Sequence, residues 1–548
     1  MSDTEMVNRK NPNRYILHIL LVVLISVVIR WIFIILNKVP FNSDEAIVGL
    51  MANHILKGEN PTFFYGQAYM GSLDGYIVAG FFALLGNSIT AIRISQSILF
   101  VLFMVASYYL AYLLFKSRKA ALTTIIILGG SPVNFFLYTT VTLGGYIEAL
   151  LIGICILILG YKIEENVDFG VKNTTALKVQ FFMLGLFVGA GIWVLGMTLI
   201  FCISALIMLG INLNRKKLKF GIIIEALTIM VVGCVLGGLP VLVYIYTNGV
   251  GVFLNELMGS AISIGQQAYL NQIGLHLVNF ILFGISAVLG FRPPWNANWL
   301  LLPLIPVVLA IWGFLLRKTY IFEQKTRSSL LIRIWLPSII LMVVFVLTPF
   351  GMDPSGRYFI PINISLAFTV GLWAAHNSFQ KNKYTVIILA ALLAYNIGGI
   401  FQSAYQSPDG ITTQFAPGTS IDHKYDHELI DFLKESSNTR GYSTYWTAYP
   451  IAFKSNEDVI LVPALPYHAD LKHTTRDNRY EPYSKLVNES QNPVYVTSNN
   501  PNLDRQLVLK LTELGVQWSE KIIGDYRVYY ELSRKVLPEE IGFGINRQ

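Results

Sequence analysis

Long apolar runs separated by short polar stretches fill the chain up to residue 403. Most of these runs are long enough to cross a bilayer as a helix, which takes about 20 residues. The run 179–212 would measure about 50 Å as one helix, so we expect two helices that meet near residues 191–196. The apolar runs lie at 15–36, 76–86, 91–115, 120–137, 142–161, 179–212, 220–246, 276–290, 299–316, 330–349, 358–375 and 384–402.

The distribution of lysine and arginine decides how many of these runs cross the membrane. Three basic residues precede the first run and hold the N-terminus in the cytoplasm: Arg9, Lys10 and Arg14. Thirteen crossings would place the basic stretches at 116–119 and 162–178 on the far side, against the positive-inside rule. Counting 76–86 as an interfacial helix returns these two stretches to the cytoplasm. Counting 276–290 as interfacial or re-entrant does the same for the basic stretch 317–333. We therefore predict an α-helical polytopic membrane protein with about 11 crossings, within a range of 11–13.

The composition changes abruptly after residue 403. Residues 1–403 form the predicted membrane domain, with outer loops at 37–90 and 247–298. Residues 404–548 are more polar and form a predicted extracytoplasmic α/β domain. Its predicted strands lie at 459–462, 494–496 and 526–530, and its predicted helices include 429–434 and 507–514.

Composition agrees with a membrane protein and argues against several classes of partner and site. Of the 548 residues, 54% are hydrophobic and 14% are charged, which is too apolar for a soluble chain of this size. The formal net charge of +8 reflects basic cytoplasmic loops, so we expect no nucleic-acid partner. Cys155, Cys202 and Cys234 all lie in apolar runs and predict neither a disulfide nor a metal framework. Because no glycine-rich nucleotide loop is present, we expect no nucleotide substrate.

The most informative chemical feature is the acidic pair Asp44-Glu45, which follows the first apolar run. Carboxylates at this depth are costly to desolvate and suggest acid–base chemistry at the membrane surface. The stretch 45–56 has helical periodicity, so we expect an amphipathic helix along the membrane. The alternative is structural, because Asn42, Ser43 or Asp44 could simply cap that helix.

The segment from Phe41 to Phe100 resembles the N-terminal region of GT-C glycosyltransferases. Its letters are FNSDEAIVGLMANHILKGENPTFFYGQAYMGSLDGYIVAGFFALLGNSITAIRISQSILF. The likeness is to the branch that contains protein O-mannosyltransferases and the lipid A aminoarabinose transferase (glycosyltransferase family 39-like). The family's acidic pair matches Asp44 and Glu45, and its arginine matches Arg93. One departure is the stretch 70–73, where many members carry prolines. The identity of the acceptor therefore cannot be inferred from the family.

This resemblance implies a GT-C fold and a defined reaction. A sugar (hexosyl or pentosyl) moves with inversion from a polyprenyl-phosphate carrier to an acceptor hydroxyl, on the outer face of the cell (plasma or inner) membrane. Asp44 then becomes the general base, and Glu45 supports the site or binds the acceptor. The expected partners are the lipid-linked donor, the bilayer and a glycan, lipid or protein acceptor. We expect no cofactor, although a divalent cation stays open.

Further candidates carry the rest of this chemistry. Glu148 is a second catalytic candidate inside an apolar helix, although it could instead pair with an arginine. Arg357-Tyr358 resembles the family's late Arg-Tyr pattern and could hold the donor phosphate through a bidentate guanidinium. The alternative for Arg357 is an arginine that snorkels to the headgroups. Secondary phosphate candidates are Lys57 and Arg93, and the substrate-binding candidates are Tyr65, Gln67, Tyr69, Gln266, Gln267 and Tyr269. For the last three, an interfacial cluster of aromatic and amide groups is an equally good explanation.

Other functions remain to be weighed. The pairs His423/His427 and His468/His473 are spaced too loosely to favour a metal site. A transporter or flippase of lipid-linked sugars would need polar groups spread over several helices and two related halves, which the sequence does not show. A membrane scaffold or receptor would leave Asp44, Glu148 and Arg357 unexplained. A polysaccharide polymerase stays possible within the enzyme class.

Overall fold

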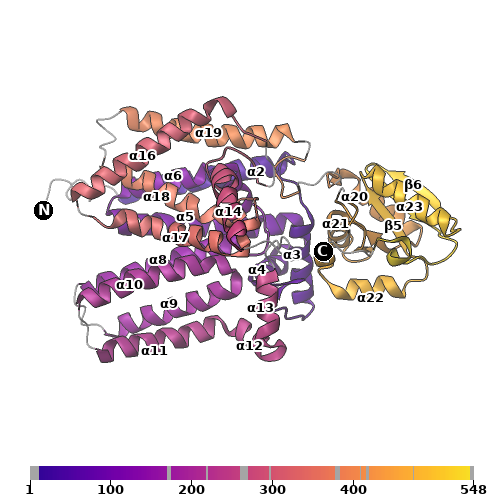
Figure 1. Cartoon of the computed structure of the whole chain (residues 1–548), viewed down its shortest axis with the longest axis horizontal. Helices are drawn as coiled ribbons and strands as arrows, with labels where there is room; N and C mark the ends of the chain where they lie inside the picture. Colours follow the sequence, from indigo (N-terminus) through magenta and orange to yellow (C-terminus); the bar gives the residue numbers. More distant parts are fainter. Residues whose placement is uncertain are drawn as a thin grey trace.

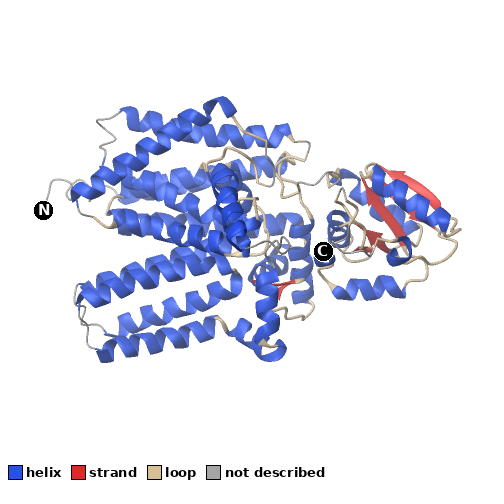
Figure 2. Ribbon diagram, viewed as in Figure 1, coloured by secondary structure: helices blue, strands red, loops and turns tan. Residues whose placement is uncertain are grey.

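The computed structural model of the chain describes residues 12–168, 174–216, 220–259, 269–294, 298–326, 328–376, 383–407, 409–414, 419–468, 470–472 and 474–543. A large helical bundle holds the N-terminal part of the chain, and an α/β domain sits at one end of it (Figure 1). Strands lie almost entirely in that domain, apart from one short hairpin at the end of the bundle (Figure 2).

The elements of the bundle are, in chain order, α2 (Pro12–Ile35), α3 (Ser43–Leu56), β1 (Phe63–Phe64), β2 (Gln67–Gly71), α4 (Leu73–Leu85), α5 (Ile89–Phe115), α6 (Arg118–Gly129), α7 (Val133–Tyr138), α8 (Tyr146–Asp168), α9 (Thr174–Val194), η1 (Gly196–Thr198), α10 (Leu199–Lys216), α11 (Phe220–Gly237), α12 (Leu239–Asn248), α13 (Val250–Gly259), α14 (Tyr269–Val278), η2 (Asn279–Gly284), α15 (Ile285–Val288), η3 (Leu302–Leu304), α16 (Ile305–Thr326), α17 (Leu330–Leu347), η4 (Pro349–Met352), η5 (Arg357–Phe359), α18 (Ile360–His376) and α19 (Lys383–Gln406).

Caps and small residues explain where these helices begin and how closely they pack. Ser88 Oγ accepts a hydrogen bond from the Ala91 amide at 3.2 Å, which satisfies a free donor at the start of α5. Helices α9 and α11 pack main chain to main chain, because a Cβ on Gly185 or Gly233 would overlap carbonyl groups of the facing helix. Such small-residue contacts hold helices together in lipid, where burial of apolar surface adds little.

The crossings agree closely with the prediction. Within the described residues, nine helices are long and apolar enough to span a membrane, and the pair α11–α12, bent by 66°, makes a tenth. The run 179–212 is two helices, α9 and α10, as predicted. The eleventh predicted crossing, 120–137, is divided by Gly130-Ser131-Pro132 into α6 and α7, each too short alone. The runs at 76–86 and 276–290 form shorter apolar helices, in keeping with interfacial or re-entrant segments.

The orientation of the bundle gives a testable prediction. The lysine and arginine asymmetry places Lys119 in the cytoplasm and the C-terminal domain outside. In a background without the three native cysteines, we expect Glu513→Cys to react with a membrane-impermeant maleimide in intact cells and Lys119→Cys to react only after permeabilisation. Both positions are at the protein surface, so access to the side chain does not limit labelling. Labelling of Lys119→Cys in intact cells would contradict this orientation and indicate the opposite one.

The C-terminal domain contains a mixed five-stranded sheet. Its strand order is β4-β3-β5-β7-β6, with β4, β3 and β5 parallel and the β5–β7–β6 pairings antiparallel. The three predicted strands and both predicted helices are present, whereas β3 and β6 escaped the sequence analysis. The elements are η6 (His423–Tyr425), α20 (Asp426–Glu435), β3 (Arg440–Ser443), α21 (Tyr445–Lys454), β4 (Ile460–Pro463), η7 (Thr475–Asp477), α22 (Glu481–Glu489), β5 (Val494–Ser498), α23 (Pro501–Glu513), β6 (Ser519–Ile523), β7 (Tyr526–Tyr530) and η8 (Pro538–Ile541).

Helix α3 joins the two parts of the molecule, and here the prediction of an amphipathic surface helix is wrong. Most of α3 is buried, because α4 packs on one side of it and α21 of the C-terminal domain packs on another. At Gly49 the ring of Phe453 comes so close that a Cβ would lie 2.5 Å from it. Residues that the pattern assigned to water therefore face protein, and Asp44 at the start of α3 lies at the junction of the two parts.

Candidate active site

Asp44 is held in the first turn of α3 with its carboxylate turned away from helix capping. Asn42 is the capping residue, and its Oδ1 accepts from the Asp44 amide at 3.1 Å. The carboxylate of Asp44 instead accepts from the Tyr445 hydroxyl at 2.6 Å and from Thr413 Oγ1 at 3.3 Å. The helix dipole favours an anion at this position. The capping alternative thus belongs to Asn42, which leaves Asp44 available for chemistry.

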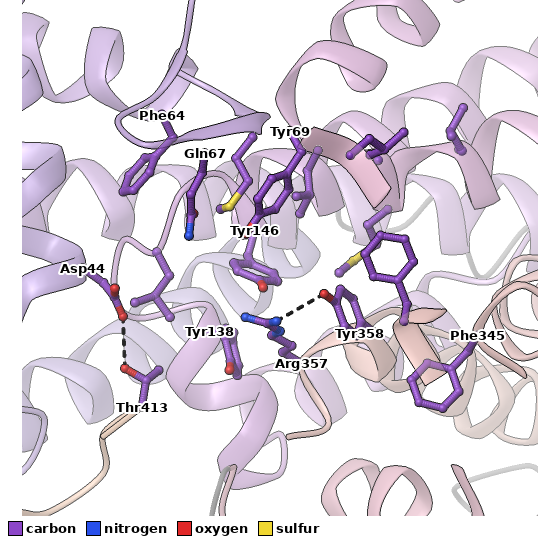
Figure 3. A pocket seen from close by; sticks show the side chains of 18 of the residues that line it. Asp44, Phe64, Gln67, Tyr69, Tyr138, Tyr146, Phe345, Arg357, Tyr358 and Thr413 are labelled. Carbon is purple, nitrogen blue, oxygen red and sulfur yellow. Dashed lines mark hydrogen bonds between the residues drawn. The ribbon is translucent and has the colours of Figure 1, made fainter. Parts of the chain in front are cut away.

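Asp44 opens into a cavity of about 430 Å³ between the bundle and the C-terminal domain. Figure 3 shows Asp44 at one end, Arg357 near the centre, and Phe345 toward the other end. The polar and aromatic side chains that line the cavity are Asp44, Phe64, Gln67, Tyr69, Tyr138, Tyr146, Phe345, Phe350, Arg357, Tyr358, Thr413, Tyr445, Trp446, Tyr467, Asp477 and Arg479.

The end of the cavity beyond Phe345 is apolar and reaches the outer surface of the bundle. It is lined by residues of α10 and α17, among them Leu199, Ile203 and Val344. These three side chains are 42%, 39% and 40% exposed. Because α10 and α17 are both candidate membrane spans, the exposed residues face lipid. The cavity therefore connects Asp44 with the bilayer through a gap between the two helices.

Arg357 is fixed at the centre of the cavity by its own loop. Its Nε lies 2.7 Å from Asp353 Oδ2, and its Nη2 donates to the Tyr358 hydroxyl at 3.2 Å. Gly356 precedes it with φ +85°, and its carbonyl accepts from Asn134 Nδ2 at 3.0 Å. The guanidinium lies among Tyr138, Tyr146 and Tyr358 (Figure 3). It is thus directed into the cavity rather than toward a headgroup layer.

The C-terminal domain supplies the wall around Asp44. The Arg479 guanidinium lies over the Tyr445 ring, 5.5 Å from its centroid. The Gln67 amide oxygen turns toward Arg479, because this orientation lets Nη2 donate to it at 2.8 Å and Nη1 donate as well. Burial acts to lower the pKa of Arg479, but Tyr445, Tyr69 and Asp44 outweigh it and raise that pKa, so the side chain stays charged. Burial, reinforced by Asp44, raises the pKa of Tyr445, so its hydroxyl keeps the proton that it donates to Asp44.

Glu45 points away from the cavity into a buried ion pair. Arg93 Nη2 lies 2.5 Å from Glu45 Oε2, and the two side chains are 2% and 1% exposed. Arg93 also donates to the carbonyl oxygens of Val39 and Pro40. Burial raises the pKa of Glu45 to about 7, although Arg93 acts in the opposite direction. Arg93 does not line the cavity, and its Nη2 is engaged by Glu45 and the main chain, so the structure does not bring it to the place where Arg357 lies.

A second pair of buried carboxyl groups lies beside Glu45. Asp74 accepts from Gln96 Nε2 at 3.0 Å and from Thr142 Oγ1, and it is adjacent to Glu148. Burial raises the pKa of Asp74. Glu148 is 2% exposed and does not line the cavity. Among the described residues no arginine pairs with Glu148, and its catalytic role stays a prediction for a group that lies outside the cavity.

Comparison with known proteins places this architecture. No family model matches the chain, and no curated protein sequence matches it significantly. Among solved structures, ArnT from Cupriavidus metallidurans bound to undecaprenyl phosphate is similar over 98% of this chain and 100% of its own, at 12% identity and TM-score 0.61. ArnT in the apo state covers 92% and 97%, at 13% identity and TM-score 0.58. The Archaeoglobus fulgidus oligosaccharyltransferase, in complex with Zn and sulfate, covers 86% and 67%, at 13% identity and TM-score 0.50.

The chain has the GT-C fold.

Within this GT-C fold, the remaining sequence candidates divide into two groups. Gln67, Tyr69 and Tyr358 line the cavity as expected. Lys57 does not: it is exposed and pairs with Glu457 of the C-terminal domain. Tyr65 also lies elsewhere, hydrogen-bonded to His54 and Glu59. Gln266 and Gln267 lie outside the described residues, as do the side chain of Tyr269 and all of His473.

Of the paired histidines, the structure gives one a clear role. His423 Nδ1 lies 3.0 Å from Asp426 Oδ2, and Lys454 pairs with the same carboxylate. In the part of the chain that the structure describes, no three His, Cys, Asp or Glu side chains gather as metal ligands would.

The buried carboxyl groups predict a stability that falls as pH rises. Glu45 has a folded-state pKa of about 7, above its usual value, so its contribution is complete in acid and is lost as pH rises through about 7. The loss is on the order of 3 kcal/mol, at about 1.4 kcal/mol per pKa unit. Asp74 acts in the same direction. We expect the unfolding temperature of the purified protein to fall between pH 5 and pH 8, as measured by scanning fluorimetry.

A variant separates this cluster from general effects of pH. Glu148→Gln removes one of three neighbouring carboxyl groups and should flatten the dependence. The exposed carboxylate of Asp458 gives a matched control, because Asp458→Asn should keep the wild-type slope. A slope of the opposite sign in the wild-type protein would contradict the prediction.

Proposed function

We propose that the chain transfers a sugar from a polyprenyl-phosphate-linked donor to an acceptor hydroxyl, with inversion at the anomeric carbon. The observation that carries the proposal is the order of groups along one cavity: a carboxylate (Asp44), a guanidinium (Arg357) and an apolar exit to lipid between α10 and α17. A lipid chain, a phosphate and a sugar follow one another in the same order in such a donor. The similar ArnT structure binds undecaprenyl phosphate, which supports this choice.

Each part of the donor has a matching part of the cavity. The polyprenyl chain would leave through the apolar gap, so the donor never has to leave the bilayer. The phosphate would meet Nη atoms of Arg357, because a guanidinium binds phosphate oxygens in a planar fork. The sugar would then lie between Arg357 and Asp44, beside Gln67 and Tyr69.

The reaction follows from this placement. Asp44 takes the proton of the acceptor hydroxyl while that oxygen attacks the anomeric carbon. The bond between this carbon and the phosphate oxygen breaks, and the lipid phosphate keeps the bonding electrons. Arg357 stabilises the charge that grows on the phosphate. Because base and leaving group lie at different positions along the cavity, attack and departure occur on opposite faces of the sugar, which gives inversion.

The same proposal fixes the side of the membrane. The cavity is lined by residues of both the bundle and the C-terminal domain. That domain sits at one end of the bundle (Figure 1). The positive-inside rule places that end on the extracytoplasmic side. The membrane itself would be the cell membrane. A lipid-linked donor suits that side, because it is delivered within the bilayer and needs no soluble nucleotide sugar.

The test is a donor panel. Purified protein in lipid nanodiscs is incubated with polyprenyl-phosphate mannose, glucose, galactose, arabinose and N-acetylglucosamine, and released polyprenyl phosphate is quantified by mass spectrometry. We expect one donor to be consumed in the presence of an acceptor mixture from the cell envelope. A flippase, the main alternative, would instead move an intact donor across a vesicle bilayer without releasing lipid phosphate.

A further inference from the structure

The C-terminal domain end of the cavity contains groups that the donor does not use. Trp446 follows Tyr445 in α21 and packs edge-on against it, with ring centroids 4.9 Å apart. Since Tyr445 donates to Asp44, this tryptophan lies next to the proposed base. The lipid exit lies at the opposite end, beyond Arg357 (Figure 3). The space around Trp446 is therefore on the acceptor side of Asp44.

The surface of this end is aromatic. Trp446 and Tyr467 meet edge to face with ring centroids 6.0 Å apart, and both line the cavity. The ring of Tyr467 also packs at a tilt against that of His468, with centroids 4.2 Å apart. The faces of sugar rings carry C–H groups that pack well against such rings, while their edges carry hydroxyl groups that need hydrogen-bond partners.

One hydrogen-bond donor on this surface, the indole N–H of Trp446, lacks a partner among the described residues. Trp446 is 7% exposed, and among the described residues no acceptor reaches its buried Nε1. Buried indole N–H groups normally find an acceptor, and leaving one unsatisfied is unfavourable. A ligand oxygen in the cavity would satisfy it.

The charges at this end argue against an anionic ligand. The charged groups that line it are Asp44, Asp477 and Arg479, so two carboxylates face one guanidinium. Both Nη atoms of Arg479 donate to Gln67, and its guanidinium lies over Tyr445. A phosphate or carboxylate placed beside Asp44 would meet net negative charge at short range in a poorly solvated site.

We infer that the acceptor is an uncharged carbohydrate, whose ring packs on Trp446 and Tyr467 and whose oxygen accepts from Trp446 Nε1. This inference rests on the proposed function, because it names the acceptor class for the same cavity. The attacking hydroxyl of that carbohydrate is the one that reaches Asp44. A peptide would also be uncharged, but it would leave the aromatic surface without a matching apolar ring.

Direct binding tests the inference without any donor. The full-length protein is placed in lipid nanodiscs, which avoid sugar-based detergents, and titrated calorimetrically. The probes are N,N′-diacetylchitobiose, maltose and methyl α-mannoside, with glucose 6-phosphate as the anionic sugar and acetyl-Ala-Thr-Ala-amide as the peptide. We expect at least one neutral sugar to bind saturably and more tightly than the other two probes.

Two substitutions at Trp446 distinguish the contribution of its ring to sugar binding from that of its N–H group. Trp446→Phe keeps an aromatic face and should weaken sugar binding about 2- to 13-fold, the value of one neutral hydrogen bond. Trp446→Leu removes the ring and should abolish measurable binding. Trp518→Phe, in the same domain and outside the cavity, is the matched control and should bind as the wild type. Unfolding temperatures of all three variants show that each one is folded.

The outcomes are distinct for the two proposals. Absence of neutral-sugar binding, tighter binding of glucose 6-phosphate, or wild-type binding by folded Trp446→Leu would overturn the carbohydrate inference. Sugar binding that depends on Trp446 supports it, even if no lipid-linked donor in the panel is consumed, in which case the transfer reaction alone fails.

Discussion

Asp44→Asn should lower the rate of sugar transfer by about 10²- to 10⁴-fold, the usual contribution of a positioned general base. Asparagine keeps the shape of the side chain, and its Oδ1 can still accept from the Tyr445 hydroxyl. It cannot take a proton from an acceptor hydroxyl at neutral pH. Donor binding should stay near normal, because the donor phosphate and lipid bind at Arg357 and beyond. Both quantities come from one experiment, by single-turnover release of lipid phosphate at increasing donor concentration.

Two controls show whether the lower transfer rate of Asp44→Asn comes from loss of the general base or from a change in folding. Asp458→Asn makes the same replacement at an exposed carboxylate of the C-terminal domain and should leave transfer unchanged. The unfolding temperature of Asp44→Asn should match the wild type within a few degrees, since Asn42 rather than Asp44 caps α3. Turnover close to the wild-type rate would remove Asp44 from the mechanism.

The sequence was sufficient to predict the bundle and one end of its cavity. Membrane helices are readable because each must satisfy its own main chain and present an apolar surface to lipid. Asp44 was readable because an acidic residue just after a first crossing is costly and has few structural uses. Arg357 was singled out by the resemblance of Arg357-Tyr358 to a late Arg-Tyr pattern of GT-C glycosyltransferases, at the mouth of a late crossing. These signals are local, so a single segment carries each of them.

The opposite wall of the cavity had no local signal. Tyr445 donates to Asp44 from 401 residues away, and Trp446 and Arg479 line the same cavity. In the sequence, all three are ordinary residues of an α/β domain. Only the docking of the C-terminal domain, with α21 packed against α3, brings them to the site. The same docking explains the error at α3, whose polar residues face protein instead of water. Periodicity shows that a helix has two faces, but it cannot say whether water, lipid or a distant domain covers the second.

The partners of the charged residues near the site could not be predicted from the sequence for a related reason. Arg93, Glu45 and Glu148 all lie within or beside apolar helices, where charge suggests function. Arg93 and Glu45 neutralise each other, and Glu148 lies beside Asp74. A sequence shows the cost of burying a charge but does not show its partner, and the partner decides whether the charge can reach a substrate.

Arg357→Ala should weaken donor binding and slow departure of the lipid phosphate. A charge-assisted contact contributes about 1.5–3 kcal/mol, which corresponds to about 10- to 150-fold in donor affinity. Arg357→Lys should restore only part of this loss, because an ammonium group keeps the charge but not the planar fork. If Arg357 merely anchors the headgroup layer, lysine should serve equally well. The measurement is kcat/KM for one donor, with Arg333→Lys as the matched control, since Arg333 pairs with Glu164 and lines no part of this cavity.

A substitution at Asp353 distinguishes two roles of Arg357, namely binding of the donor phosphate and support of its own loop. In the free protein it is the partner of Arg357, and it is 1% exposed. Removing Arg357 therefore takes the nearest cation from a buried carboxylate and leaves it only the more distant Arg292, so lost activity in Arg357→Ala could come from a displaced loop. Asp353→Asn makes the opposite change, because it leaves the guanidinium in the cavity without its internal anion. If the donor phosphate binds Arg357, it replaces that anion, and Asp353→Asn should bind donor at least as tightly as the wild type. If the ion pair only shapes the loop, Asp353→Asn and Arg357→Ala should lose donor affinity together, and that result would remove Arg357 from the phosphate site.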